Sequence, residues 1–177
     1  MSLKDTQRWL KDLGENYSLK ELTNITYLYL SQKRIKDFSP LKNLTNLAYL
    51  DLGYNQIKDL SPLKDLTNLT QLFLDNNQIK DISTLSNLTN LNRLSLFSNE
   101  ISDISPLQNL KNLSSLYMSR NKIENISPIK ELKKLTHLFL DNNKITIIEG
   151  QDTSFLKKHN IKYKTVPDNL VNRELYL

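Results

Sequence analysis

Leucine and isoleucine recur along the chain at a mixture of short and longer steps. In residues 66–83 they occupy positions 66, 69, 72, 74, 79 and 82. An amphipathic helix would repeat at three and four residues and a half-buried strand at two, so neither accounts for the whole stretch. The step of two between Leu72 and Leu74 predicts a short strand, and the remaining residues predict a turn that brings the chain back.

This pattern returns every 22 residues. Three aligned columns of apolar residues carry it: Ile25, Leu47, Leu69, Leu91, Leu113 and Leu135; Leu28, Leu50, Leu72, Leu94, Leu116 and Leu138; and Leu30, Leu52, Leu74, Leu96, Met118 and Leu140. Five repeats are complete and a sixth ends near Ile148. A fixed period in this range predicts a solenoid in which each coil adds one strand and successive strands stack in parallel.

Polar residues keep the same period. An asparagine stands at each turn after the strand, where its amide can bond backbone groups of adjacent coils: Asn55, Asn77, Asn99, Asn121 and Asn143. Ser-Pro pairs follow at 39–40, 61–62, 105–106 and 127–128, and we expect the serine to cap a short helical turn that the proline starts. Lys33 replaces the first asparagine, and Ser83-Thr84 replaces one Ser-Pro pair, which should loosen that turn slightly.

The repeat LxxLxLxxNxI, followed by xDISPLxxLxN, resembles the leucine-rich repeat family over residues 23–148. Within that family it is similar to the 22-residue class shared by bacterial internalins and a eukaryotic phosphatase regulator. The resemblance implies an α/β fold: a right-handed solenoid with a parallel concave β-sheet and short 3₁₀ or irregular segments on the convex side. It also implies an internal ladder of asparagines and a protein-binding function.

Both ends of the solenoid need capping, because a terminal coil has no neighbour on one side. Residues 1–22 are predicted to form a helical cap, in which Trp9, Leu10 and Leu13, together with Thr6, have helical spacing. Residues 23–148 are assigned to the repeats and 149–177 to a C-terminal cap. Within that cap we expect a helical turn and a degenerate last strand over 155–166, since Ile161 and Tyr163 repeat the spacing of the strand leucines. Residues 167–177 could pack or fray.

Side chains between the strand leucines are not needed for the core, and aromatic rings gather there. Eight of the thirteen Tyr and Phe residues occupy these outward positions: Tyr27, Tyr29, Tyr49, Tyr54, Phe73, Phe97, Tyr117 and Phe139. Large rings on a water-facing surface carry an aggregation risk, and aromatic residues and Arg dominate binding hot spots. Rings can also stack across strands and only brace the sheet. Recognition and bracing therefore both stay open.

The candidate ligand-binding face is completed by charged residues in the same outward rows: Asp51, Asp75, Arg93, Arg120, His137 and Asp141. We predict a non-enzymatic module that binds a protein ligand through this concave face. The alternatives are a carbohydrate or peptidoglycan binder, because rings also stack on sugars, and a structural spacer without a ligand. Six strands about 4.8 Å apart span roughly 24 Å, which is too small a patch for a standard protein interface. A protein ligand would therefore need the loop rims or a cap as well, or its affinity would be modest.

The sequence gives little support for a catalytic site. The chain has no cysteine and two histidines, His137 and His159. Asp51 and Asp75 are expected about 8 Å apart, a separation known from inverting glycosidases. An open sheet should desolvate neither carboxylate, so we expect no raised acid pKa. The segments DNNQ and DNNK, at 75–78 and 141–144, lack the glycine and terminal glutamate of a calcium loop. We predict no enzyme, no cofactor and no metal.

Charge and composition narrow the partners further. The net charge of +5 is spread along the chain, and only Arg93, Arg120 and His137 place a basic group among the rings, so we predict no nucleic-acid ligand. The chain has no run of about 18 apolar residues, so we predict no membrane span. Seven Asn-X-Ser/Thr sequons favour a bacterial or cytosolic protein. We expect a monomer that is cytoplasmic as the sequence stands, or secreted or surface-attached if a leader precedes it.

Overall fold

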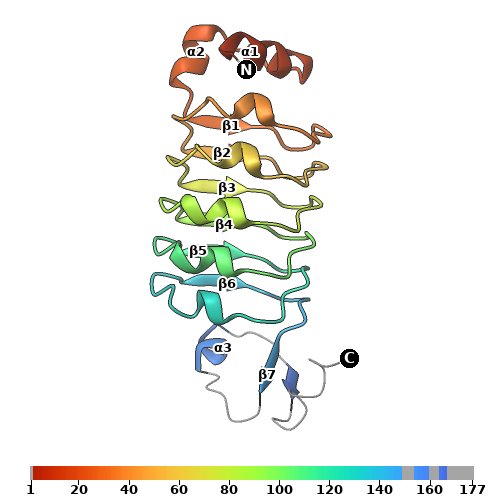
Figure 1. The fold of residues 1–177 in the computed structure, drawn as a ribbon, viewed down its shortest axis with the longest axis vertical. Helices are drawn as coiled ribbons and strands as arrows, with labels where there is room; N and C mark the ends of the chain where they lie inside the picture. Colours follow the sequence, from red (N-terminus) through yellow and green to blue (C-terminus); the bar gives the residue numbers. More distant parts are fainter. Residues whose placement is uncertain (1, 149–153, 160–163, 167–177) are drawn as a thin grey trace.

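Parallel strands stacked one per coil form the spine of the molecule (Figure 1). The structure is a computed structural model that describes residues 2–148, 154–159 and 164–166. Within these residues the main sheet has six strands in the order of the sequence: β1 (Tyr27–Tyr29), β2 (Tyr49–Asp51), β3 (Gln71–Phe73), β4 (Arg93–Ser95), β5 (Ser115–Tyr117) and β6 (His137–Phe139). The predicted α/β leucine-rich-repeat solenoid is confirmed.

Strand pairing follows the 22-residue period. Leu50 pairs with Leu28 on one side and Leu72 on the other, and the same offset holds to β6. The middle leucine of each strand points inward and is buried, while its two neighbours point to the opposite face. A parallel sheet in which every coil contributes the same inward residues therefore builds one continuous core from the aligned aliphatic columns.

Short 3₁₀ turns return the chain on the other side of the core. They are η1 (Ser39–Leu41), η2 (Ser61–Leu63), η3 (Ser83–Asn87), η4 (Ser105–Asn109) and η5 (Ser127–Ile129). Proline stands at the start of four of them, as predicted.

The role expected for the serines as caps was wrong. In η1, Ser39 is the first 3₁₀ residue, and Asp37 two positions earlier accepts hydrogen bonds from both its backbone nitrogen (2.8 Å) and its hydroxyl (3.1 Å). The same aspartate contact to the backbone recurs at Asp81, where the chain has Ser83-Thr84, so η3 forms without the proline. The carboxylate is the stronger acceptor, and it satisfies the free N–H that begins the turn.

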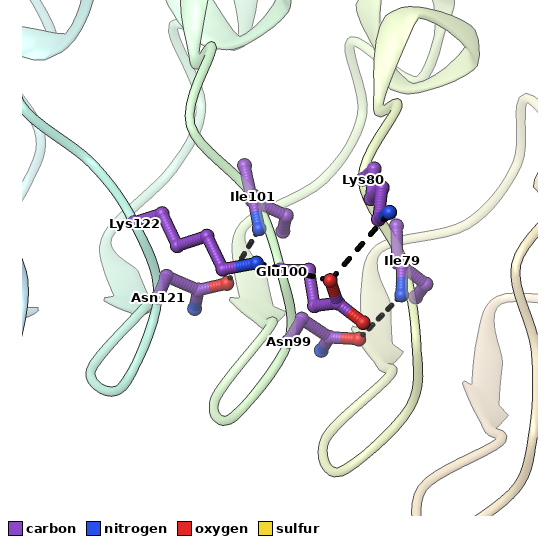
Figure 2. A network of polar contacts seen from close by, with 7 residues as sticks. All are labelled: Ile79, Lys80, Asn99, Glu100, Ile101, Asn121 and Lys122. Carbon is purple, nitrogen blue, oxygen red and sulfur yellow. Dashed lines mark hydrogen bonds and ion pairs between the residues drawn. The ribbon is translucent and has the colours of Figure 1, made fainter.

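A ladder of buried and half-buried asparagines joins successive coils (Figure 2). Asn99 Nδ2 donates to Leu74 O of the preceding coil (3.0 Å) and to Leu96 O of its own (3.2 Å), while its Oδ1 accepts from Ile79 N (3.1 Å). Asn121 repeats these contacts one coil later. Each amide therefore satisfies backbone groups that the turn leaves without partners, which explains why the asparagine keeps the repeat period.

A second asparagine ladder, which the sequence analysis did not identify, runs along the solvent side. Asn46, Asn68, Asn90 and Asn112 each donate from Nδ2 to the backbone oxygen of the threonine 23 residues earlier, at 2.8–3.0 Å. These residues are exposed. The outer ladder bonds each coil to the previous one where water competes, so it contributes less to stability than the buried ladder.

Two helices lie at the N-terminal end of the stack (Figure 1). Helix α1 (Leu3–Asp12) buries Leu10 and Thr6, and the Thr6 hydroxyl donates to Pro40 O at 2.6 Å. Helix α2 (Leu19–Asn24) begins with a capping box formed by Ser18 and Glu21 and ends beyond the expected boundary at residue 22. The helix expected from Thr6, Trp9, Leu10 and Leu13 is therefore present, whereas α2 was not predicted.

Lys33, which replaces the first asparagine of the ladder, connects these helices to the first coil. Its Nζ lies 2.8 Å from Glu15 Oε1 and donates to Leu13 O at 3.0 Å. Its backbone nitrogen donates to Asn55 Oδ1 at 3.1 Å. The lysine therefore takes the first place of the ladder, and its side chain contacts the segment after α1.

At the other end, β7 (Thr146–Ile148) and β8 (Lys164–Val166) pair in parallel as a separate two-stranded sheet. Helix α3 (Ser154–Lys158) buries Leu156 against the core. Helix α3 lies in the part of 155–166 where a helical turn is expected, whereas β8 begins after Ile161 and Tyr163, the residues on which the expected last strand is based, so that strand stays a prediction. Ile161, Tyr163 and residues 167–177 lie outside the described residues, and the division of the chain at 22 and 148 stays a prediction.

Candidate ligand-binding face

A ribbon of rings crosses the outward face of the main sheet, which we call the concave face. Tyr49 on β2 is its first junction: its ring centroid lies 5.9 Å from that of Tyr27, 4.7 Å from Tyr29 and 5.2 Å from Phe73 on β3. The rings meet because parallel strands in register place residues 22 apart side by side. Tyr27 and Tyr29 are about 60% exposed and leave the end of the ribbon open to solvent.

Arg93 continues the ribbon where β4 offers no ring. Its guanidinium carbon lies 5.3 Å from the centroid of Phe73 and 5.3 Å from that of Tyr117. Tyr117 then stacks on Phe139, with centroids 5.1 Å apart and planes inclined by 7°. Cation–π attraction replaces ring stacking at this one strand, so the contact chain runs unbroken from β1 to β6.

Beyond the strands, a row of turn residues adopts the left-handed conformation. Gln32, Tyr54, Asn76, Ser98, Arg120 and Asn142 have φ between 52° and 60°. Non-glycine residues seldom adopt this region, which costs about 1 kcal/mol for each. The conformation places Tyr54, 59% exposed, and Arg120 along the rim of the concave face. The Arg120 guanidinium carbon lies 5.4 Å from the ring centroid of Phe97.

A shallow hollow of about 360 Å³ opens between the ribbon and this rim. Its lining residues are Tyr54, Asp75, Asn76, Ser95, Phe97, Tyr117, Ser119 and Phe139. Ser95 and Ser119 stand in the outward rows of the repeat, yet they are buried at 6% and 9% exposure. Small side chains between large rings are covered by them, so the two serines form a floor and the rings form walls.

Asp75 lies in this hollow, and the expectation that its pKa would stay unraised was wrong. Partial burial raises the pKa of its carboxyl above the ordinary value, with the nearby Asp51 carboxylate adding to the rise. Two hydrogen bonds to Oδ1 act in the opposite direction: one from the Ser95 hydroxyl and one from Phe97 N at 3.1 Å. The rings beside it remove water that a flat sheet would have left, so desolvation outweighs the hydrogen bonds.

The remaining candidates are dispersed over the face. Asp51 is half-buried and accepts from Gly53 N at 2.9 Å. His137 and Asp141 are exposed at the β6 end, where His137 Nδ1 lies 3.0 Å from Thr136 Oγ1. In the described part of the chain, His, Asp and Glu side chains do not gather in threes that could hold a metal ion.

Sequence reasoning missed the hollow itself, and with it the roles of Asn76, Ser95 and Ser119 in lining it. Asn76 Nδ2 is buried and has no hydrogen-bond partner among the described residues. These polar residues sit in the outward rows of the repeat, but residue type alone gave them no weight. The alternation of rings with small residues on neighbouring strands is the signal that could have indicated a depression.

Comparison with protein families supports the assignment of the repeats. The family described as Leucine Rich repeats (2 copies) matches residues 23–65, 45–87, 89–131 and 111–158. The chain belongs to the leucine-rich repeat family. Such repeats are typically protein-binding, and the fold is generally non-catalytic. A comparison with curated protein sequences gave no significant match. Among the described residues, no helix has the length and apolar character needed to cross a bilayer.

Solved structures of internalins are similar to this chain. A crystal structure of an internalin (inlF) from Listeria monocytogenes matches with a TM-score of 0.73 at 30% identity, covering 93% of this chain and 54% of that one. An internalin C2 (inlC2) from the same species matches with a TM-score of 0.63 at 36% identity, and the match covers 81% of this chain and 72% of that one. A leucine-rich repeat protein of Leptospira interrogans matches with a TM-score of 0.70 at 26% identity, and the match covers 84% of this chain and 38% of that one. The predicted internalin-like resemblance is confirmed, and the chain spans about half of inlF.

Proposed function

We propose that this leucine-rich repeat module binds a protein partner through the ring ribbon of its concave face. The observation that supports this most strongly is the unbroken chain of contacts from Tyr27 to Phe139 through Arg93. Rings held by their neighbours lose little freedom when a partner covers them, and aromatic residues and arginine supply most of the binding energy in protein interfaces.

The exposed ends of the ribbon also favour recognition over bracing. Bracing alone needs rings that cover one another, yet Tyr27, Tyr29 and Phe139 keep between 45% and 60% of their surface in water. That exposure costs solubility without adding contacts inside the chain. The half-buried rings Tyr49, Phe73 and Tyr117 would then form the rigid centre of the interface, and the exposed rings its edges.

Site-specific photo-crosslinking tests this proposal. A benzophenone amino acid replaces Phe73 on the concave face in one variant and Lys64, an exposed residue beyond η2, in a matched control. After irradiation in an extract of the native cells, we expect a discrete crosslinked protein only from the Phe73 position. Titration with that protein after purification then has to reproduce the interaction.

Equal crosslinking from both positions, or none from Phe73, would contradict the proposal. A glycan array probed with the same protein distinguishes the carbohydrate alternative, since glycan binding that disappears with Phe73→Ala and Tyr117→Ala would replace a protein by a sugar ligand. A spacer would give neither signal, and replacing Tyr49 and Phe97 by serine would then lower only its melting temperature.

A further inference from the structure

The hollow on the concave face combines four rings with one charged group. Tyr54, Phe97, Tyr117 and Phe139 contribute rings to its lining, and Asp75 is the charged residue among the lining residues. The electron-rich faces of aromatic rings attract cations, and a carboxylate beside them adds a direct counter-charge. This combination of rings and an acid is the chemistry that recognises an ammonium or guanidinium group.

The Asp75 carboxylate lacks a cationic partner within the described residues. None of the ion pairs found there includes it: they join Lys33 to Glu15, Lys80 and Lys122 to Glu100, and Lys133 to Glu131. The hydrogen bonds from Ser95 Oγ and Phe97 N both end on Oδ1, so neither of them uses Oδ2. A partly buried carboxylate without a counter-ion is a costly arrangement that a ligand cation would relieve.

We infer that the hollow receives a basic side chain, lysine or arginine, from the surface of the protein partner, with Asp75 as its counter-ion and the four rings as its walls. This inference rests on the proposed protein-binding function and names the anchor through which the partner is held. Burial raises the pKa of Asp75 in the free protein. A bound cation would lower that pKa again, so binding and the ionisation of Asp75 are linked.

Arg120 lies beside the hollow, over the ring of Phe97, with 5.4 Å between its guanidinium carbon and the ring centroid. An incoming cation would be repelled by Arg120, whereas an anionic ligand would be attracted to it. Removing this arginine therefore distinguishes the two signs of charge. Arg120→Ala should strengthen or leave unchanged the binding of a basic group, and it should weaken the binding of an acidic one.

The test uses small probes in place of the unidentified partner. Nα-acetyl-lysine N-methylamide and its neutral norleucine counterpart are titrated into the intact chain, and the amide resonances of Ser95 and Phe97 are followed by NMR. We expect millimolar binding of the lysine probe, since one side chain buries little surface. The norleucine probe should bind about tenfold more weakly because it lacks the charge-assisted hydrogen bond to Asp75.

Two variants tie the response to the hollow. Asp75→Asn should weaken the lysine probe about tenfold and leave the norleucine probe unchanged. Tyr54→Asn removes an exposed wall and introduces the residue found at the equivalent left-handed positions 76 and 142, so the backbone is preserved. It should weaken the lysine probe about threefold through the lost cation–π contact.

The inference is overturned if the lysine probe shifts no resonance of the hollow, if norleucine binds equally well, or if Arg120→Ala weakens the lysine probe. It is also overturned if Asp75→Asn binds the lysine probe as tightly as the wild-type chain does, or if the bound probe does not lower the pKa of Asp75 in the wild-type chain. Such a failure is separate from the proposed function, because crosslinking at Phe73 would still identify a protein held by the ring ribbon without a basic anchor.

Discussion

At the scale of single residues, the surroundings of a side chain decide its chemistry more than its position in the repeat does. Asp75 and Asp141 share one repeat position. Asp141 is exposed, whereas Asp75 lies in the hollow beside Phe97 and has a raised pKa because of burial. The repeat pattern predicts that both aspartates point outward, but it does not predict the hollow. The hollow forms because rings from neighbouring strands surround small residues.

The raised pKa of Asp75 predicts a defined pH dependence. The folded state holds this proton more tightly than the unfolded state, so Asp75 contributes stability below its unfolded pKa, and that contribution is lost as the pH rises through the folded pKa. The free energy of unfolding of Asp75→Asn, taken relative to wild type, should therefore increase as the pH rises from the unfolded pKa of Asp75 through its higher folded pKa. Urea unfolding curves at a series of pH values measure it.

Asp81→Asn is the matched control and should behave in the opposite way. Hydrogen bonds from Ser83 lower the pKa of Asp81. Its contribution is therefore present above the unfolded pKa and is lost as the pH falls through the folded pKa. Asp81→Asn should consequently lose stability relative to wild type as the pH rises. Parallel pH profiles for the two variants would contradict the assigned environments.

At the scale of elements, two asparagine ladders bond each coil to the next, one buried and one exposed. Asn99 is 8% exposed and serves backbone groups of two coils, whereas Asn112 donates to Thr89 O at the solvent side. The inner ladder also lies beside a surface network in which Glu100 joins Lys80 and Lys122 (Figure 2). These lysines are more than half exposed, so the ion pairs are screened and add little.

Asn99→Ala should destabilise the fold by about 2 kcal/mol, because it leaves Ile79 N buried without a partner, whereas Leu74 O keeps its hydrogen bond from Asn77 Nδ2. Asn112→Ala should cost about 0.5 kcal/mol, because water replaces both exposed hydrogen bonds of this side chain, the one donated to Thr89 O and the one accepted from Lys134 Nζ. Chemical denaturation followed by circular dichroism compares the two. Equal losses would show that burial does not separate the ladders.

Much of this element structure was predictable because strict periodicity carries it. The step between Leu72 and Leu74 predicted the strands, and the asparagines of the turns predicted the inner ladder. The short helix α2 was not predicted, although Ser18 and Glu21 have the spacing of a capping box. The outer ladder was also missed, although Asn46, Asn68, Asn90 and Asn112 recur at the same period of 22 residues.

At the scale of the whole molecule, the solenoid separates two tasks between two sets of residues. Aliphatic side chains fill one continuous core, and the rings between them reach the concave face, where they and Arg93 form a chain of contacts across the six strands of the main sheet within the described residues. The rim residues Tyr54 and Arg120 widen this face beyond the strands. A partner can therefore be exchanged in evolution by changing outward residues while the core stays as it is.

The central claim is that the concave face holds the partner and that the ring ribbon supplies most of the binding energy. Isothermal titration calorimetry with the crosslinked protein, once purified, tests it with a triple variant in which Tyr49, Phe73 and Tyr117 become serine. A convex triple variant, Lys42, Lys64 and Lys111 to serine, is the control. We predict that the dissociation constant rises by about 100-fold or more for the ribbon variant, since each hot-spot ring contributes about 2 kcal/mol, and that it is unchanged for the control. A ribbon variant that stays folded and binds as tightly as wild type would contradict the claim.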